Sequence, residues 1–381
     1  MADIFKFADE LGPLKVIHVY EPSVNLKAVL VRGTHRCTWA DPAALNAYSK
    51  QLSADSFGPA TAKYRELGTA ANMLVFNRLN ALPTRNFQLG SFAEASNLAP
   101  ESLATHRTRT RASCAACTIG CEHIYTLNKG AGQTKSTVRV EYESLFALGA
   151  LCGIGDAEQV LRASQLCDEL GMDTISAGGT IAFAMECGER GILDAPWLRF
   201  GDGNALLKAL RMIGRREGLG DRLADGSRLL SQHLGDNSHE FAPHVKGLEL
   251  PGYEPRAMQT MALGLAVGAR GADHNRSGAY EADFSQHADR RHLTPLSAEW
   301  AVATEDQSAV FDSLILCKFI RRVLVDTYDS AADMLHMVTG WPVAAEELRQ
   351  TAQRIVTARK LFNVRAGWTP EEDTLPPRFF Q

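Results

Sequence analysis

The segment Cys114-Ala115-Ala116-Cys117-Thr118-Ile119-Gly120-Cys121 is the most informative stretch of this sequence, for its fold as well as its chemistry. Gaps of two and three residues between the cysteines let a tight loop direct several thiolates at one centre, and Gly120 permits a backbone turn that a side chain would block. Structural zinc sites more often use two separated Cys/His pairs, whereas three clustered cysteines plus a remote one are typical of iron–sulfur proteins. The segment therefore predicts an iron–sulfur site, with zinc or simple packing of small residues as alternatives.

Basic residues precede this segment at His106, Arg107, Arg109 and Arg111. Positive charge beside anionic thiolates would raise the reduction potential of a cluster. The alternative is that these side chains form a solvated face of a loop.

The composition of the whole chain describes an ordinary globular protein. With 381 residues, 45% of them apolar and 22% charged, the chain is long enough for two or three domains. Forty basic against 44 acidic residues give a net charge of −4, so nucleic acid is not expected as a partner.

No secretory signal or membrane-spanning segment is expected. The N-terminus lacks a cationic stretch followed by an apolar run and a cleavage site, and the richest apolar run, residues 258–267, is short and interrupted by glycine. We therefore expect a cytoplasmic location, where a disulfide framework would not persist. Cys37, Cys152, Cys167 and Cys187 lie in apolar or helical contexts and are predicted to be packing residues.

Hydrophobic periodicity predicts a mainly α fold after a short β-rich beginning. Two β segments are expected at 14–20 and 26–31. Helices are expected at 157–170, from an N-cap at Asp173 to about 187, and at 204–217, 221–234, about 306–328 and 344–366. A stretch dense in Gly and Pro begins near residue 241, and the predicted divisions are a β-rich remnant at 1–32, a helical domain at 33–243 and a C-terminal helical domain at 244–381.

The cysteine segment, together with Asp312-Ser313-Leu314-Ile315-Leu316-Cys317, resembles the [4Fe-4S] ligand set of the tungsten-containing aldehyde ferredoxin oxidoreductases. The resemblance continues, in order, through Asn25-Leu26-Lys27-Ala28-Val29, Asn86-Phe87-Gln88, Glu141-Tyr142-Glu143-Ser144, Cys167-Asp168-Glu169-Leu170-Gly171-Met172-Asp173-Thr174-Ile175-Ser176, Leu248-Glu249-Leu250-Pro251 and Asp373-Thr374-Leu375-Pro376. Ordered matches along residues 25–380 are far more specific than a single motif. The sequence is therefore identified as a member of this family, with the two helical domains that follow the family's β-rich first domain.

The resemblance implies a set of cluster ligands and a set of cofactor contacts. The cluster ligands would be Cys114, Cys117, Cys121 and Cys317. A tungsten or molybdenum bis-pterin would be held by Asp168, Asp173 and Asp312, because carboxylates accept hydrogen bonds from pterin amino and ring N–H groups. The alternative role for these aspartates is helix capping.

The resemblance also implies that Glu143 and His274 lie near the metal and the substrate. Such a pair could move protons during oxidation of a hydrated aldehyde, since burial or neighbours can shift each pKa towards neutrality. Otherwise Glu143 would satisfy helix N–H groups and His274 would simply pack.

Two departures from the family count against pterin binding. Only the residues before Asn25 stand where the family has a substantial N-terminal domain that carries the cofactor, so that domain is expected to be missing. Ile315 occupies a position where the family normally has glycine, which would crowd the approach of a ligand to the backbone.

Three functions remain open. The first is an iron–sulfur oxidoreductase acting on an aldehyde or related small molecule, with a ferredoxin-like electron carrier and a separate chain supplying the first domain. The second is a repurposed, truncated member that uses the cluster without tungstopterin, and the third is a non-catalytic electron-transfer subunit. In each case the chain is expected to associate, either with a second copy or with a first-domain subunit.

Overall fold

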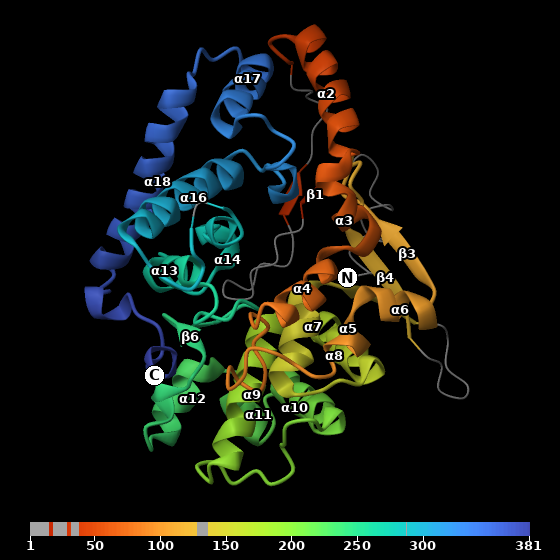
Figure 1. Cartoon of the computed structure of the whole chain (residues 1–381), viewed down its shortest axis with the longest axis vertical. Helices are drawn as coiled ribbons and strands as arrows, with labels where there is room; N and C mark the ends of the chain where they lie inside the picture. Colours follow the sequence, from red (N-terminus) through yellow and green to blue (C-terminus); the bar gives the residue numbers. More distant parts are fainter. Residues whose placement is uncertain (1–14, 18–28, 32–37, 128–135, 287) are drawn as a thin grey trace.

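The computed structural model describes residues 15–17, 29–31, 38–127, 136–286 and 288–381. The predicted mainly helical fold is confirmed: in these residues helices make up most of the chain and are joined by three small antiparallel sheets (Figure 1). The strands are β1 (Lys15–Ile17), β2 (Val29–Val31), β3 (Arg109–Ala112), β4 (Glu122–Thr126), β5 (Thr137–Val140), β6 (His244–Val245) and β7 (Leu248–Glu249). The first part of the chain carries helices α2 (Pro42–Ser56), α3 (Pro59–Leu67), α4 (Asn72–Arg78), α5 (Ala95–Leu98), α6 (Pro100–His106), α7 (Tyr142–Leu148), α8 (Ala157–Leu170) and α9 (Thr174–Glu189). They are followed by α10 (Gly203–Arg215), α11 (Leu219–Leu223), α12 (Gly226–Leu234), α13 (Gln259–Val267), α14 (His274–Ser277), α15 (Tyr280–Asp283), α16 (Pro295–Ser313), α17 (Thr327–Thr339) and α18 (Ala345–Arg365).

Several boundaries follow from capping groups that are visible in the sequence. The Asp156 carboxylate accepts N–H groups at the start of α8, and Gly171 ends this helix in the left-handed conformation, so the predicted helix at 157–170 is confirmed. Asp173 caps α9 through the N–H of Ser176, as predicted, although the helix continues past Gly188 to Glu189. None of the helices in the described ranges has the length and apolar character needed to cross a bilayer.

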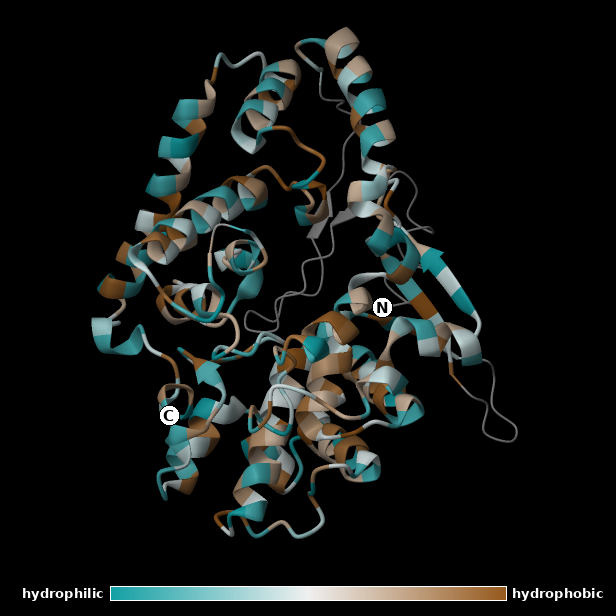
Figure 2. Ribbon diagram, viewed as in Figure 1, coloured by the Kyte–Doolittle hydropathy of each residue, from teal (hydrophilic) through white to brown (hydrophobic). Residues whose placement is uncertain are grey.

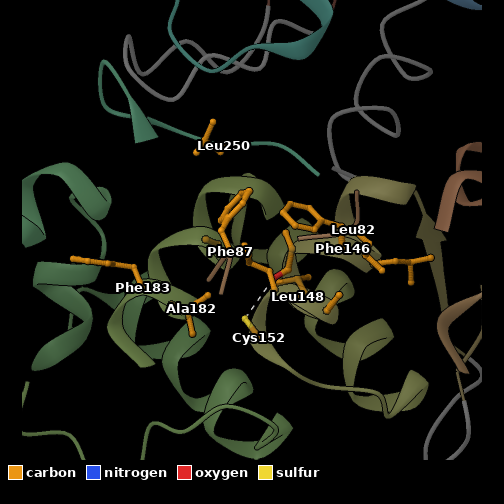
Figure 3. Packing of buried hydrophobic residues seen from close by; sticks show 14 of the residues in the cluster. Leu82, Phe87, Phe146, Leu148, Cys152, Ala182, Phe183 and Leu250 are labelled. Carbon is orange, nitrogen blue, oxygen red and sulfur yellow. Dashed lines mark hydrogen bonds between the residues drawn. The ribbon is translucent and has the colours of Figure 1, made fainter. Parts of the chain in front are cut away.

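The larger hydrophobic core is built around α7 and α9, where hydrophobic residues concentrate (Figure 2). The two helices approach closely because α9 has glycine at the contact: a Cβ on Gly178 would lie 2.4 Å from the Ala147 carbonyl oxygen. The Phe87 and Phe146 rings meet edge to face in this core, with centroids 6.2 Å apart (Figure 3). Cys152 lies among them, fully buried.

The prediction that the remaining cysteines are packing residues is confirmed for those described. Cys152, Cys167 and Cys187 each have 0% exposure. Cys37 lies outside the described residues.

Two predicted helices are wrong in their limits. The helix expected at 221–234 is divided into α11 and α12, because Gly226 takes a positive φ of 84° and the Glu249 carboxylate receives the N–H of Ser227. The helix expected at about 306–328 is α16, which ends at Ser313, followed by a separate α17. Ile315 at φ 56° interrupts the helical path, and Asp326 caps the new start.

A smaller core joins α16, α17 and α18. The larger core contains residues from both sides of position 243, including Phe183 and Met261. The divisions at 1–32, 33–243 and 244–381 stay predictions.

Candidate functional site

The three clustered cysteines lie in the connection of a β-hairpin. Strands β3 and β4 pair antiparallel with Ala112 opposite Glu122, so residues 113–121 form the loop between them. Ala116 and Gly120 have positive φ values of 57° and 59°, which supply the tight turns. The turn at Gly120 was expected from the sequence, but this sheet was not, because its strands are only four or five residues long.

The loop is ordered by backbone hydrogen bonds that involve the cysteines. The N–H of Cys117 donates to the Cys114 carbonyl at 3.1 Å, and the N–H of Ile119 donates to the Cys117 sulfur at 3.4 Å. Ile119 is buried beneath the loop, whereas Cys114 is exposed and Cys117 and Cys121 are half-buried.

Cys317 approaches the loop from the end of α16. Burial raises its pKa, the N–H groups of Phe319 and Ile320 oppose that rise, and the thiols of Cys117 and Cys114 add to it. Burial likewise raises the pKa of Cys121 to about 12, with smaller contributions from Glu141 and then from the other three cysteines of the set. The charges of Cys114 and Cys117 act on both Cys121 and Cys317, which indicates that Cys317 faces the loop, and none of the four cysteines forms a disulfide.

Helices α2 and α3 each contact one of the two cysteine segments. Tyr64 on α3 stacks on Phe319, with ring centroids 4.2 Å apart and 24° between the planes. The hydroxyls of Ser56, at the end of α2, and Thr118 are 3.1 Å apart. Over the described ranges, no three Cys, His, Asp or Glu side chains stand ready to bind one metal ion.

A cavity of about 380 Å³ lies beside this region, where elements from both halves of the chain meet. Its walls combine acidic and aromatic side chains. The lining residues are Lys63, Tyr64, Thr69, Asn72, Phe76, Glu141, Tyr142, Glu143, Ser144, Asp173, Thr174, Ile175, Tyr253, His274, Asn275, Tyr280, Glu281, Phe284, Phe319 and Arg322.

Glu143 and His274 meet in this cavity from α7 and α14. The Glu143 Oε1 atom lies 3.7 Å from the His274 Nε2 atom. Glu143 Oε2 accepts the N–H of Gly252 at 2.9 Å, whereas Oε1 is buried and has no hydrogen-bond partner. A buried carboxyl oxygen that lacks a partner is costly unless a ligand or water satisfies it.

The pair is uncharged at neutral pH. Burial raises the pKa of Glu143 to about 8; the Gly252 N–H opposes the rise and Asp173 adds to it. Burial lowers the pKa of His274 to about 4; Asp273 opposes this and Lys318, Arg321 and Arg270 add to it. Glu143 is therefore protonated and His274 neutral, so their contact is not an ion pair.

Aromatic rings fix the position of His274. The Tyr253 ring lies 5.3 Å from the His274 ring and 5.4 Å from the Tyr280 ring, and Arg321 donates to the Tyr280 hydroxyl at 2.8 Å. These tyrosines and Gly252 were not among the predicted site residues. The only available signal was that Gly252 and Tyr253 directly follow the motif ending at Pro251.

Comparisons with known proteins identify the family of the chain. A family model described as "Aldehyde ferredoxin oxidoreductase, domains 2 & 3" matches residues 44–381. The tungsten-containing aldehyde ferredoxin oxidoreductase of Pyrococcus horikoshii is 35% identical over 376 residues, covering 94% of this chain and 60% of the relative. The chain belongs to the aldehyde ferredoxin oxidoreductase family. It spans about 60% of the length of the curated relatives that it matches.

Two more distant proteins also match. The aliphatic sulfonate oxidoreductase WOR-like subunit of Pyrococcus furiosus is 26% identical over 379 residues, covering 94% of this chain and 57% of the relative. The active site complex BamBC of benzoyl coenzyme A reductase, solved with 1,5-dienoyl-CoA, has a TM-score of 0.71 at 19% identity, over 93% of this chain and 61% of that one. The latter likeness concerns the fold alone.

The three aspartates that match the family's pterin segments are in different situations. Asp173 lines the cavity while it caps α9. Asp168 lies on α8 and is exposed as a residue. Its carboxyl group is nevertheless partly shielded from water, which raises its pKa. Asp312 is held by two cations, with Arg276 Nη1 3.0 Å from Oδ2 and Lys318 Nζ 3.1 Å from Oδ1.

The arginines flanking His274 do not face the cavity of this aldehyde ferredoxin oxidoreductase homologue. Arg270 pairs with Asp273 at 2.5 Å, and Arg276 pairs with Asp312. Both line a separate hollow of about 520 Å³ against α18. Of the predicted site residues, Glu143, His274 and Asp173 line the cavity, and Phe319, two residues after Cys317, lines it as well.

Proposed function

We propose that the chain forms the proton-transfer and electron-relay part of an iron–sulfur oxidoreductase that oxidises an aldehyde or a related small molecule. The observation that carries the proposal is the buried Glu143 Oε1, which lacks a hydrogen-bond partner and faces His274 across 3.7 Å within the cavity. A substrate oxygen beside the pair would reach both groups.

The protonation states of the pair suit this chemistry. Oxidation of an aldehyde hydrate to a carboxylic acid removes two protons and two electrons. Neutral His274 accepts the hydroxyl proton at Nε2, while the C–H hydrogen leaves the carbon together with the electron pair. Protonated Glu143 donates a hydrogen bond through its carboxyl group to the second substrate oxygen. The rings of Tyr253 and Tyr280 line the site.

The cysteines fit a [4Fe-4S] cluster by the chemistry of their donors. Cys114, Cys117, Cys121 and Cys317 are neighbouring thiols outside any disulfide, and backbone N–H groups point at the sulfurs of Cys117 and Cys317. Each thiolate binds a different iron of such a cluster, so the four sulfurs need not converge as they would on one ion. When bound, the cluster supplies one-electron transfer to a ferredoxin-like carrier.

A bis-pterin that uses both aspartate segments does not fit the residues as they stand. Both oxygens of Asp312 are engaged by Arg276 and Lys318, and the side chain of Ile315 stands where the family has glycine. We derive no step through that group. The centre that first takes the electron pair is assigned to a region of the kind that the relatives carry beyond the matched part.

Aldehyde-dependent dye reduction tests this function. Protein isolated anaerobically from its own cells, so that a partner chain is retained, should reduce benzyl viologen when acetaldehyde or benzaldehyde is added. Glu143→Gln and His274→Ala should lower the rate by about 100-fold or more. The exposed controls Glu217→Gln and His233→Ala should keep it. Absence of aldehyde-dependent reduction, or full activity in both site variants, would contradict the proposal.

The ion pairs that Asp312 forms with Arg276 and Lys318 favour a second function. A repurposed family member would use the cluster without tungstopterin, and the ion pairs of Asp312 with Arg276 and Lys318 would then be permanent. Metal analysis of protein produced with tungstate and molybdate available separates the two. Iron without tungsten or molybdenum, in the isolated complex, favours the second function.

A further inference from the structure

We propose that the basic face formed by exposed Arg109 and Arg111, with half-buried Arg65 beside them, binds the acidic protein that exchanges electrons with this chain. The inference rests on the proposed function for the role of that partner, but binding at this face is a separate property. The partner is a small, acidic electron carrier of the ferredoxin type.

The face is built from an edge strand and the end of a helix. Strand β3 lies at one edge of the sheet β3-β4-β5, and Arg109 and Arg111, two residues apart, extend from the same side of it. Their guanidinium groups donate to the carbonyls of Glu66 at 2.5 Å and Arg65 at 2.9 Å, in the last turn of α3. Helix C-termini leave carbonyls without intrahelical partners, so these contacts hold both arginines in place.

The charge of this face is not neutralised within the described residues. None of the three arginines has a carboxylate within 4.0 Å there, whereas neighbouring Arg107 and Arg139 pair with Glu158 and Glu122 at 2.7 Å and 2.6 Å. The Arg65 guanidinium instead lies 4.3 Å above the Phe57 ring. Each guanidinium has five N–H donors, so most remain available to carboxylates of a partner.

The positive charge of Arg109 and Arg111 contrasts with the charge of the chain as a whole. The chain as a whole has a net charge of −4, so this concentration of unpaired cations is a local feature. The nearest acidic side chain on the same helix is exposed Glu66, which forms no ion pair among the described residues.

The position of the face suits electron exchange. Arg111 precedes exposed Cys114 by three residues on the β3–β4 hairpin. Arg65 follows Tyr64, whose ring stacks on Phe319 beside Cys317. A protein docked here would therefore contact the edge of the four-cysteine region, and opposite charge would accelerate its encounter with the chain.

The test measures binding of a purified acidic ferredoxin to the full chain by stopped-flow and surface plasmon resonance at low and high salt. Arg109→Glu combined with Arg111→Glu should lower the association rate at least about tenfold at low salt, and the difference should vanish near 1 M salt, where the Debye length is about 3 Å. Arg354→Glu combined with Arg365→Glu makes the same charge change on α18, across the molecule from β3 (Figure 1), and should change the rate little. Arg109→Lys with Arg111→Lys should retain most of the binding, because it keeps the charge.

The proposal would be overturned if the charge reversals on β3 and on α18 lowered the association rate equally. It would also be overturned if the wild-type chain did not bind ferredoxin. Tighter binding of a single-stranded oligonucleotide than of ferredoxin at the same face would also overturn it, in favour of a nucleic-acid partner. Benzyl viologen reduction separates this outcome from failure of the enzyme, because the dye needs no docking face. If the chain reduces the dye but the Arg109 and Arg111 substitutions do not change ferredoxin binding, the docking face is refuted and the proposed function is not.

Discussion

Glu143 is half-buried, its Oε1 atom is buried without a hydrogen-bond partner, and its pKa is raised to about 8. Its neighbour His274 is also half-buried, with a pKa lowered to about 4. Groups with pKa values pushed apart in this way can act as proton donor and acceptor at the same pH.

The first prediction concerns the pH dependence of aldehyde oxidation. The working form needs protonated Glu143, which is lost as the pH rises through about 8, and neutral His274, which is lost as the pH falls through about 4. The rate of dye reduction, measured as kcat/KM, should form a plateau between these limits. Glu143→Gln should remove the alkaline limb from whatever activity remains, and an unchanged alkaline limb in this variant would count against Glu143 as the titrating group.

The second prediction concerns Ile315. This β-branched residue has a φ of 56° and is 91% exposed, so it bears the strain of a left-handed backbone without gaining burial. Ile315→Gly should raise the free energy of unfolding by about 1 kcal/mol, measured by urea denaturation of the full chain. Exposed Val325, which does not have a positive φ, is the control, and Val325→Gly should not stabilise. Loss of stability in both variants would show that Ile315 is not strained.

Gly252 links the segment before α13 to helix α7 through two hydrogen bonds. Its N–H holds Glu143, and its carbonyl accepts the Tyr142 hydroxyl. A Cβ at this position would lie 2.7 Å from the Tyr142 ring and 2.9 Å from the Phe146 ring. Glycine is therefore required for the contact that positions the carboxyl group.

The third prediction follows from this contact. Gly252→Ala should push the segment away from α7, lower the melting temperature and reduce kcat more than it changes KM, because the Glu143 carboxyl group loses its anchor. Gly188→Ala is the control, since a Cβ there has no neighbour closer than 3.7 Å. A Gly252→Ala protein with normal kcat and an unchanged crystal structure at Glu143 would refute this role.

Elements with strong end signals could be predicted from the sequence, and elements defined by tertiary contacts could not. Helix α8 has a capping aspartate and a terminal glycine, so its bounds followed from local chemistry. Strands β3, β4 and β5 are too short to show a clear alternation, and the ends of α16 depend on the Thr294–Ser297 capping box and on the backbone of Ile315. Glu143 and His274 were expected to meet only because of the family resemblance, since a sequence separation carries no geometry. Gly252 and the surrounding tyrosines could not be predicted as site residues, because only the folded chain brings them together.

At the scale of the whole molecule, several large apolar side chains are exposed. Three of them, Trp341, Phe362 and Val325, lie in the C-terminal third of the chain. Large bare apolar surfaces are uncommon on proteins that act alone.

The fourth prediction is that the chain associates in solution. Size-exclusion chromatography with light scattering should give a mass above the 41.5 kDa of one chain, from a second copy or a first-domain subunit. A monomer that captures no specific partner when isolated from its own cells would contradict this prediction.

We propose that four cysteines from two distant segments hold a [4Fe-4S] cluster beside the Glu143–His274 cavity. The iron and acid-labile sulfide content of anaerobically purified protein tests this proposal. We expect about four irons and four sulfides per chain, most of them lost in Cys317→Ala but retained in Cys187→Ala, which alters a buried packing cysteine. Stoichiometric zinc without sulfide, or equal iron in both variants, would contradict it.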